Sequence, residues 1–213
     1  MISDIVQNKK SILQKISKAG IPSSNLSAVL LYGSHIWGYD TPKSDIDLFI
    51  ILKTEQEKVH DIENISLHYQ ITPEQLSKKV LKGSWASFLC VKHASYLIFG
   101  KRPKVPDYQK AKILNYLDKN KELEIDVLLD HARAWCFQTL MKRVYFLNYF
   151  FNNNPTFKIT DFQHCKQLTQ EERDFIERQY VKIFEHEEDD NDDKVRLKEL
   201  ILNVEEIIRE RSK

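Results

Sequence analysis

The sequence predicts an α+β fold in which a small mixed sheet with helices is followed by an all-α helical bundle. In the first half, short apolar runs bounded by turn residues lie at 27–32, 45–52 and 65–71. In the second half, apolar residues instead recur at helical spacing. Because the two halves differ in kind, we predict one domain at 1–104 and a helical domain at 105–213.

The composition is typical of an ordinary globular chain. Hydrophobic residues make up 42% of the 213 residues and the net charge is +1, so the chain as a whole has no strong attraction for nucleic acid or membranes. The most apolar stretch, 134–151, is interrupted by Lys142 and Arg143, which favours a buried helix over a membrane span. The first residues lack the pattern of a signal peptide, and we expect a cytoplasmic protein. Three cysteines without C-x-x-C spacing are expected to be reduced thiols: Cys90, Cys136 and Cys165.

In the first half, turn residues and periodicity predict alternating helices and strands. A helix expected at 72–83 is the best marked, because Thr72 can serve as its N-cap, Pro73 stands at its first position and Gly83 follows its end. The segment 96–100 is either a strand or the end of a helix. The remaining elements are a helix at 2–19 and strands at 27–32, 45–52 and 65–71.

The second half is expected to be wholly helical. Two prolines at 101–108 mark the boundary before it, and "NNNP" at 152–155 ends its longest helix. An acidic block at 185–193 is expected to be a solvated loop. Helices are predicted near 107–119, 121–151, 169–186 and 193–211.

Two aspartates stand one residue apart inside an apolar strand. Side chains of a strand alternate between its faces, so Asp45 and Asp47 point the same way while Ile46 and Leu48 point into the core. Two like charges that close repel each other. A divalent cation removes that cost, and Mg²⁺ prefers one or two carboxylates together with phosphate oxygens.

A Gly-Ser pair follows the preceding strand. Gly33 allows a sharp turn and a close approach of the backbone to a ligand, and Ser34 adds a hydroxyl. A helix that begins near Ser34 would point N–H groups at an anion. Phosphate binding on one side and carboxylates for a metal on the other predict a nucleoside triphosphate site.

The whole run at 33–47, a Gly-Ser pair followed after ten residues by Asp-Ile-Asp, resembles the signature of the DNA polymerase beta-like nucleotidyltransferase superfamily. The small antibiotic-modifying and minimal nucleotidyltransferases are the most similar members. The resemblance is specific over 28–52 and looser to about residue 100, and the helical half resembles the helical domains often fused to this fold. Four further residues stand where those members have similar ones: Gly38, Thr41, Pro42 and Ser44.

The resemblance implies roles for individual residues. Asp45 and Asp47 would be catalytic and would bind Mg²⁺, with Mn²⁺ as the alternative ion, and a third carboxylate on the next strand would complete the site. Trp37, which stands where these proteins usually have an arginine, either stacks on a base or packs. Lys43 either contacts a phosphate or is an exposed turn residue. The nucleotide, with ATP expected, would be bound by Gly33, Ser34, His35, Lys43 and Ser44.

The sequence departs from the pattern at the third carboxylate. The strand at 65–71 offers Ser66, His68 and Gln70 at its alternating polar positions, and none is a carboxylate. Glu63 could replace it if the strand starts early. His68 is expected to be a half-buried structural histidine, with a base or a metal ligand as the alternative. Acids of the helical half are further candidates: Glu122, Glu124 and Asp126.

Two functions follow from these residues. The first is an enzyme that transfers a nucleoside monophosphate from a nucleoside triphosphate to a hydroxyl of a small molecule, a protein or an RNA, and releases pyrophosphate. The second is a catalytically degraded binding protein of the same fold that acts as a partner in a toxin–antitoxin or defence pair. A homodimer formed through the helical half is also expected as a partner interaction. Nucleic acid is expected as an acceptor only, and no membrane is expected as a partner.

Overall fold

The computed structural model describes residues 5, 7–38, 40, 44–119, 133–152, 158–185, 188 and 190–212. The chain divides into two compact units, Met1–Tyr108 and Gln109–Lys213. Domains were predicted at 1–104 and 105–213, and that assignment stays a prediction. The first unit contains a mixed sheet with helices, whereas the second is helical, which confirms the predicted α+β class.

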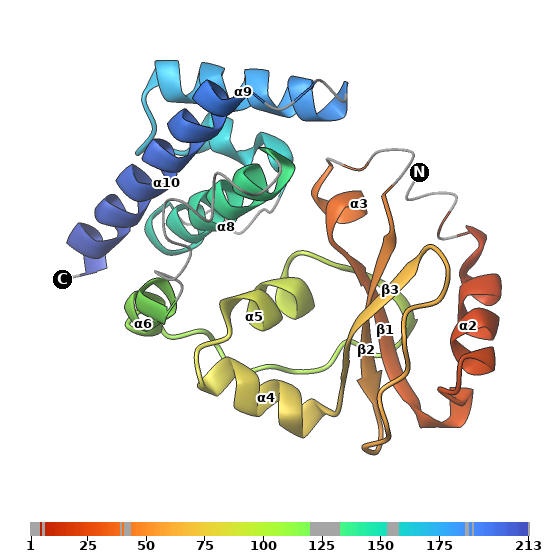
Figure 1. Ribbon diagram of the computed structural model, residues 1–213. Coiled ribbons are helices and arrows are strands. Elements are labelled where there is room, and N and C mark those ends of the chain that lie inside the picture. Colours follow the sequence, from red (N-terminus) through yellow and green to blue (C-terminus); the bar gives the residue numbers. More distant parts are fainter. Residues whose placement is uncertain are drawn as a thin grey trace. The chain divides into compact units, whose positions relative to one another are not determined.

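Four strands form the sheet of the first unit in the order β3-β2-β1-β4 (Figure 1). The central strand β1 is antiparallel to both β2 and β4, while β2 is parallel to β3. The predicted strands are confirmed to within one residue, and the ambiguous fourth segment is a strand. The bounds are Leu26–Tyr32 for β1, Ile46–Leu52 for β2, Ile65–Ile71 for β3 and Tyr96–Gly100 for β4.

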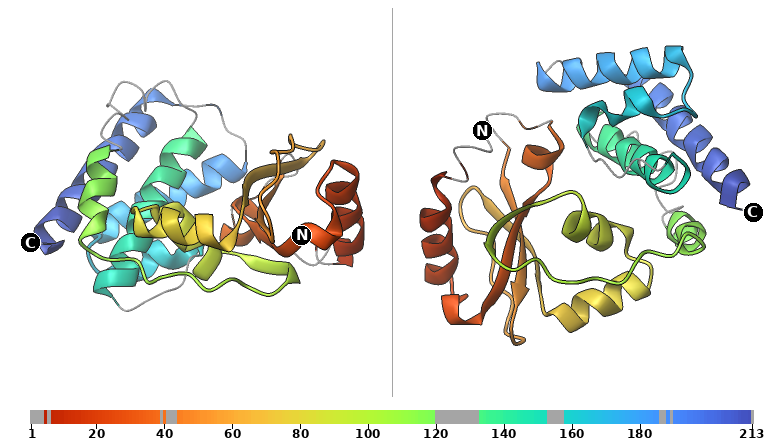
Figure 2. Two further views of the ribbon diagram at one scale, coloured as in Figure 1. Left: turned by 90° about the horizontal axis from the view of Figure 1, so that it is seen from below. Right: turned by 180° about the vertical axis from the view of Figure 1, so that it is seen from behind.

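Helix α2 (Lys9–Lys18) covers one face of the sheet, and α4 and α5 lie on the other, as Figures 1 and 2 show. The buried side of α2 presents Ile12 and Ile16 to the strands. Ile46 and Leu48 belong to the same apolar cluster, so they do face the core as predicted. The face of β2 that carries its aspartate is therefore the opposite one.

Helix α4 (Pro73–Leu81) begins where the sequence predicted. The hydroxyl of Thr72 accepts a hydrogen bond from the backbone N–H of Gln75 at 3.3 Å, and the side-chain oxygen of Gln75 accepts one from the N–H of Thr72 at 3.0 Å. This capping box satisfies two donors that a helix start leaves without partners. The predicted start of α4 is confirmed. It could be predicted because it depends on capping residues that lie next to it in the sequence.

Helix α5 (Trp85–Lys92) was not predicted. Its buried residues lie on all sides, among them Trp85, Phe88 and Val91, so it shows no polar face. A helix of that kind lacks the period that identifies an amphipathic helix. The remaining signal was Ser84, whose hydroxyl accepts a hydrogen bond from Ser87 N–H at the start of α5.

In the second unit, the described helices agree with three of the four predictions, and the helix predicted at 107–119 begins five residues later. The part of the predicted long helix at 121–132 lies outside the described residues. The short 3-10 helix η2 was not predicted. The bounds are Lys112–Lys119 for α6, Arg133–Phe151 for α8, Ile159–His164 for η2, Gln170–Phe184 for α9 and Asn191–Ser212 for α10.

Helix α8 is buried, as its apolar sequence predicted. Arg143, which interrupts the apolar run, is buried as well, and it pairs with Glu205 of α10 while its Nη1 donates to the carbonyl oxygen of Thr139 at 3.0 Å. A buried charge is tolerated only when it is paired in this way. In the described part of the chain, we find no helix with the length and apolarity needed to cross a membrane.

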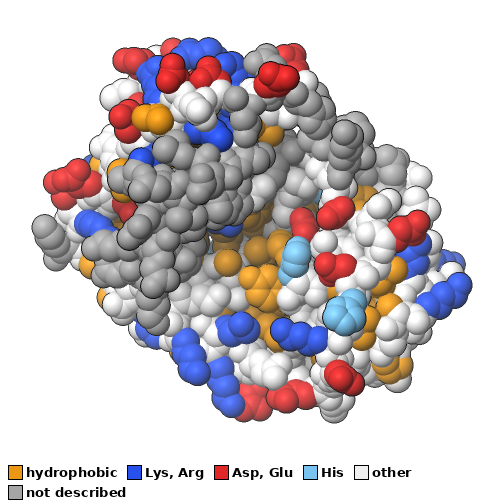
Figure 3. Space-filling view, in the orientation of Figure 1, with side chains coloured by type: hydrophobic (Ala, Val, Ile, Leu, Met, Phe, Trp, Pro, Cys, Tyr) orange, Lys and Arg blue, Asp and Glu red, His pale blue; other side chains and the backbone are white. Residues whose placement is uncertain are grey.

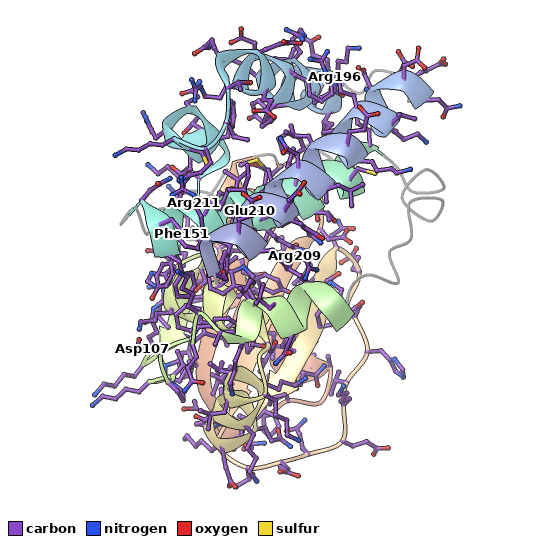
Figure 4. All side chains as sticks on the ribbon, turned by 90° about the vertical axis from the view of Figure 1, so that its left-hand side faces the viewer. Asp107, Phe151, Arg196, Arg209, Glu210 and Arg211 are labelled. Atoms are coloured by element: carbon purple, nitrogen blue, oxygen red, sulfur yellow. The ribbon has the colours of Figure 1, made fainter. Side chains whose placement is uncertain are left out.

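The ends of α8 and α10 are joined through Lys110. Its ammonium group lies 4.2 Å from the ring centre of Phe151 and donates to the carbonyl oxygen of Arg211 at 2.9 Å. Figure 4 shows Phe151 beside the C-terminal residues of α10. The three cysteines are buried and free, which confirms the expected thiols: Cys90, Cys136 and Cys165.

The contact between α2 and the sheet can be tested at Ile16, which is fully buried. Ile16→Ala should destabilise the first unit by roughly 2–5 kcal/mol, because it leaves a cavity against the strands. Hydrogen exchange of the amides of β1 and β2 should speed up accordingly. Gln14→Ala, an exposed change on the same helix, is the matched control and should leave that exchange unchanged.

Candidate active site

The turn after β1 is fixed by a glycine. Gly33 has φ 77° and ψ −153°, a conformation open almost only to glycine, and the short helix α3 (Ser34–Trp37) follows it at once. A Cβ atom added at Gly33 would overlap the carboxylate of Asp47. The predicted helix near Ser34 is thus present, and the missing side chain of Gly33 is what lets it begin beside Asp47.

The two predicted carboxylates lie at the start of β2, between two neighbouring strands. Asp47 stands opposite Tyr32 of β1 and opposite Ser66 of β3. Asp45 comes just before the strand, is exposed, and its Oδ2 accepts a hydrogen bond of 3.5 Å from the hydroxyl of Ser66. The structure therefore places Gly33, Asp45 and Asp47 at one end of the sheet. Figure 3 shows acidic side chains and histidines gathered side by side on the molecular surface.

The strand β3 has an irregular register beside this site. Asp47 pairs with Ser66, but Phe49 pairs with Tyr69, so three residues of β3 span two of β2. Such a bulge interrupts the alternation of side chains. The sequence placed Ser66, His68 and Gln70 on one face, and that expectation was wrong for Gln70.

The polar groups around the bulge have specific partners. The backbone N–H of Leu67 donates to Asp61 Oδ1 at 2.6 Å, and its carbonyl oxygen accepts from the side chain of Gln70 at 3.1 Å. Gln70 is buried, and it also bonds both backbone groups of Val59, at 2.8 Å and 2.6 Å. Side chains thus take over the hydrogen bonds that the bulge removes from the strand ladder.

His68 belongs to the site. Its Nε2 lies 3.3 Å from Asp47 Oδ1, and its side chain is 53% exposed against 23% for that of Asp47. The sequence favoured a half-buried structural histidine at this position; the side chain is indeed about half exposed, and its contact with Asp47 puts it beside the predicted carboxylates. The signal for a role at the site was present, because the residue stands on the strand next to the aspartates.

A third carboxylate is not found beside the aspartates among the residues that the structure describes. Glu63 is 71% exposed and pairs with Lys15 at 3.2 Å, so β3 does not start early enough to bring it in. In the same residues, no three Asp, Glu, His or Cys side chains are grouped as a ready metal site. The candidates from the helical half lie outside the described residues: Glu122, Glu124 and Asp126.

Two other predicted residues are buried. His35 of α3 places Nδ1 3.2 Å from Asp40 Oδ2 and is hidden from solvent, so it faces a carboxylate in the interior. Trp37 is buried too, which favours packing over stacking on a base. Ser44 is partly exposed just before Asp45, and Lys43 lies outside the described residues.

The neighbouring carboxylate of Asp45 affects the ionisation of Asp47. Burial raises the pKa of Asp47 above its ordinary value, and the charge of Asp45 raises it further, while His68 and His35 act against them. A divalent cation would stabilise the ionised form. Two carboxylates that leave room for phosphate oxygens are the donor set that Mg²⁺ uses with nucleotides, so the residues fit such an ion.

An aromatic layer continues from Asp47 along the same face of the sheet. The ring of Phe49 stacks on that of Tyr69 with 4.4 Å between centres, and Tyr32 meets Phe49 edge-on at 6.1 Å. The bulge of β3 is what brings Tyr69 opposite Phe49. Because these rings have few rotatable bonds, they form a rigid layer of side chains next to Asp47.

Gly33→Ala should disrupt the site. We expect roughly 1–3 kcal/mol of backbone strain together with a displaced Asp47 carboxylate. Gly20→Ala is the matched control, because Gly20 also has a positive φ of 115° but its added Cβ would lie 3.5 Å from Val59, an ordinary contact. Both variants should lose stability in urea unfolding, whereas Gly33→Ala alone should lose Mn²⁺ binding measured by electron paramagnetic resonance.

The raised pKa of Asp47 predicts a pH-dependent gain from Asp47→Asn. The folded protein holds this proton more tightly than the unfolded chain does, so ionisation costs stability above the raised pKa and costs nothing below 3.8, the ordinary value. In metal-free buffer, the variant should therefore resist urea better than the native chain at neutral pH. The gain should shrink as the pH falls towards 3.8.

Asp107→Asn is the control for that comparison. Its carboxylate is exposed and pairs with Lys92, which lowers the pKa of Asp107, so its loss should bring no gain at neutral pH. An Asp47→Asn variant that is less stable than the native chain at neutral pH would show that Asp47 serves the fold rather than the site.

Comparison with known proteins agrees with this geometry. The family model described as "Polymerase beta, Nucleotidyltransferase" matches residues 14–82, which run from α2 through β1, β2 and β3 to the end of α4. No curated protein matches the chain. The matched segment contains the glycine turn and both aspartates, and the resemblance predicted from the sequence is confirmed. Residues 14–82 therefore match a nucleotidyltransferase domain of the DNA polymerase beta-like type.

Proposed function

We propose that the protein is a Mg²⁺-dependent nucleotidyltransferase that moves a nucleoside monophosphate from a nucleoside triphosphate to a hydroxyl and releases pyrophosphate. The observation that carries the proposal is the close approach of Gly33 to Asp47, which brings the glycine turn and a carboxylate to one point. The family match supports the same class of reaction. ATP is the nucleotide that we expect.

Each residue of the site has a task in this reaction. Gly33 is buried and lets α3 begin beside Asp47, and Ser34, which is partly exposed, would offer its hydroxyl to phosphate oxygens. Asp45 and Asp47 would hold the metal, with Mn²⁺ as the alternative to Mg²⁺. When bound, the ion would make the acceptor hydroxyl more acidic and offset the charge of the phosphates.

The electrostatics of Asp47 favour this assignment over a structural one. A carboxylate whose ionisation costs stability is poorly suited to hold a fold together. Such a group is typical of functional sites, where the penalty is removed once the ligand binds. Lys43 and Ser44, as further phosphate contacts, stay part of the proposal.

The acceptor class can be found together with the activity. Purified protein would be incubated with each α-labelled nucleoside triphosphate, Mg²⁺ or Mn²⁺, and fractionated cell extract. We expect label in a small-molecule, protein or RNA fraction, and roughly a 10³-fold loss, equal to about 4 kcal/mol in the barrier, in Asp45→Asn and Asp47→Asn. Asp107→Asn, the same change at an exposed position of the first unit, should transfer normally.

One observation favours a second function. In the described residues, no third carboxylate joins Asp45 and Asp47, and that is consistent with a degraded enzyme that acts as a binding partner in a toxin–antitoxin or defence pair. Nucleotide binding without transfer to any fraction would support this second function. Full activity in Asp45→Asn would overturn the metal assignment.

A further inference from the structure

His68 takes up a position that the backbone prepares for it. The bulge of β3 places this residue against Asp47, with Nε2 3.3 Å from Asp47 Oδ1. Asp61 and Gln70 satisfy the backbone groups of Leu67 next to it, so the irregular register is supported by two side chains. Bulges beside active sites commonly re-aim one side chain, and here that side chain is an imidazole.

We propose that His68 is a ligand of the divalent cation at this site, which it shares with Asp47 and Asp45. The inference rests on the proposed function, since it assigns a metal ligand within the same site. It gives the ion a mixed set of nitrogen and oxygen donors instead of carboxylates alone.

The distance between the two donor atoms fits a shared ion. Ligands about 2.1 Å from a metal lie about 3.0 Å apart on neighbouring corners of an octahedron and about 3.4 Å apart in a tetrahedron. The 3.3 Å between His68 Nε2 and Asp47 Oδ1 falls within that range. Asp45 accepts a hydrogen bond from Ser66 and is not grouped with the other two among the described residues, so it would join the set only after its side chain rotates.

A purely structural role explains the contact less well. His68 is more than half exposed, so water screens its end of the pair although Asp47 is largely buried, and the pair contributes less to stability than a fully buried one would. The hydrogen bonds of Asp61 and Gln70 already stabilise the bulge without the imidazole. What His68 adds is a donor atom directed at the carboxylate.

The proposal has a consequence for metal choice. Mg²⁺ takes oxygen ligands almost exclusively, whereas transition metals accept imidazole nitrogen readily. The native site should therefore favour Mn²⁺ over Mg²⁺ more than a site built from carboxylates alone would. His68→Asp, which restores an all-oxygen set, should lower this preference.

A pulsed electron paramagnetic resonance measurement tests the ligand directly. The full chain would be loaded with Mn²⁺ and inorganic tripolyphosphate, a probe without nitrogen, so that any ¹⁴N modulation comes from the protein. We expect a ¹⁴N signal in the native chain and in His60→Ala, a change at an exposed histidine of the same unit. His68→Ala and His68→Asp should lose the signal while their circular dichroism stays native.

Competition with Mg²⁺ gives a second readout. His68→Asp should still bind Mn²⁺, and its preference for Mn²⁺ over Mg²⁺ should fall below that of the native chain, because the imidazole nitrogen that favours a transition metal has been replaced by oxygen. A preference equal to that of the native chain would overturn the proposal.

The remaining outcomes separate this inference from the proposed function. The native chain could bind Mn²⁺ without giving a ¹⁴N signal, and Asp45→Asn could abolish that Mn²⁺ binding. This result would overturn the role of His68 and leave the nucleotidyltransferase site intact. A ¹⁴N signal that persists in His68→Ala would also overturn it. A native chain that binds no Mn²⁺ with tripolyphosphate would overturn both.

Discussion

The contact between a bare Cα and a carboxylate is the constraint on which the site depends. Antiparallel pairing of β1 and β2 sets Tyr32 opposite Asp47, so the residue after β1 turns directly across the carboxylate. Only a hydrogen atom fits at Gly33. Burial of Asp47 at this crowded point also raises the pKa of its carboxyl group, so the packing at this end of the sheet affects its electrostatics as well as its shape.

The rest of the first unit supports this crowded end. On one face, the apolar residues of α2 and the strands form a continuous cluster, and on the other, aromatic rings extend from the site. Burial of that apolar surface supplies the stability that a pair of adjacent carboxylates costs. The charged residues can therefore stand at the strand end without unfolding it, as functional sites on rigid elements require.

Most of the fold followed from local signals in the sequence, while the details of the site depended on tertiary contacts. Strands β1 to β3 and helix α4 were predicted because apolar runs and caps act over a few residues. Helix α5 was missed because all its sides are apolar, and the burial of Arg143 depended on Glu205, a distant partner. Gly33, Asp45 and Asp47 were found from their spacing, but the contact of His68 required the register of β3, which one sequence does not display.

The overlap at Gly33 also links two positions in the history of this domain. As long as Asp47 keeps its carboxylate, any larger residue at position 33 meets it, so position 33 cannot change while Asp47 is present. Shortening the side chain at 47 would remove the overlap but not the positive φ of Gly33, so the turn itself would have to change as well. A related sequence with a larger residue at position 33 is therefore expected to have rebuilt both the turn and the residue at 47.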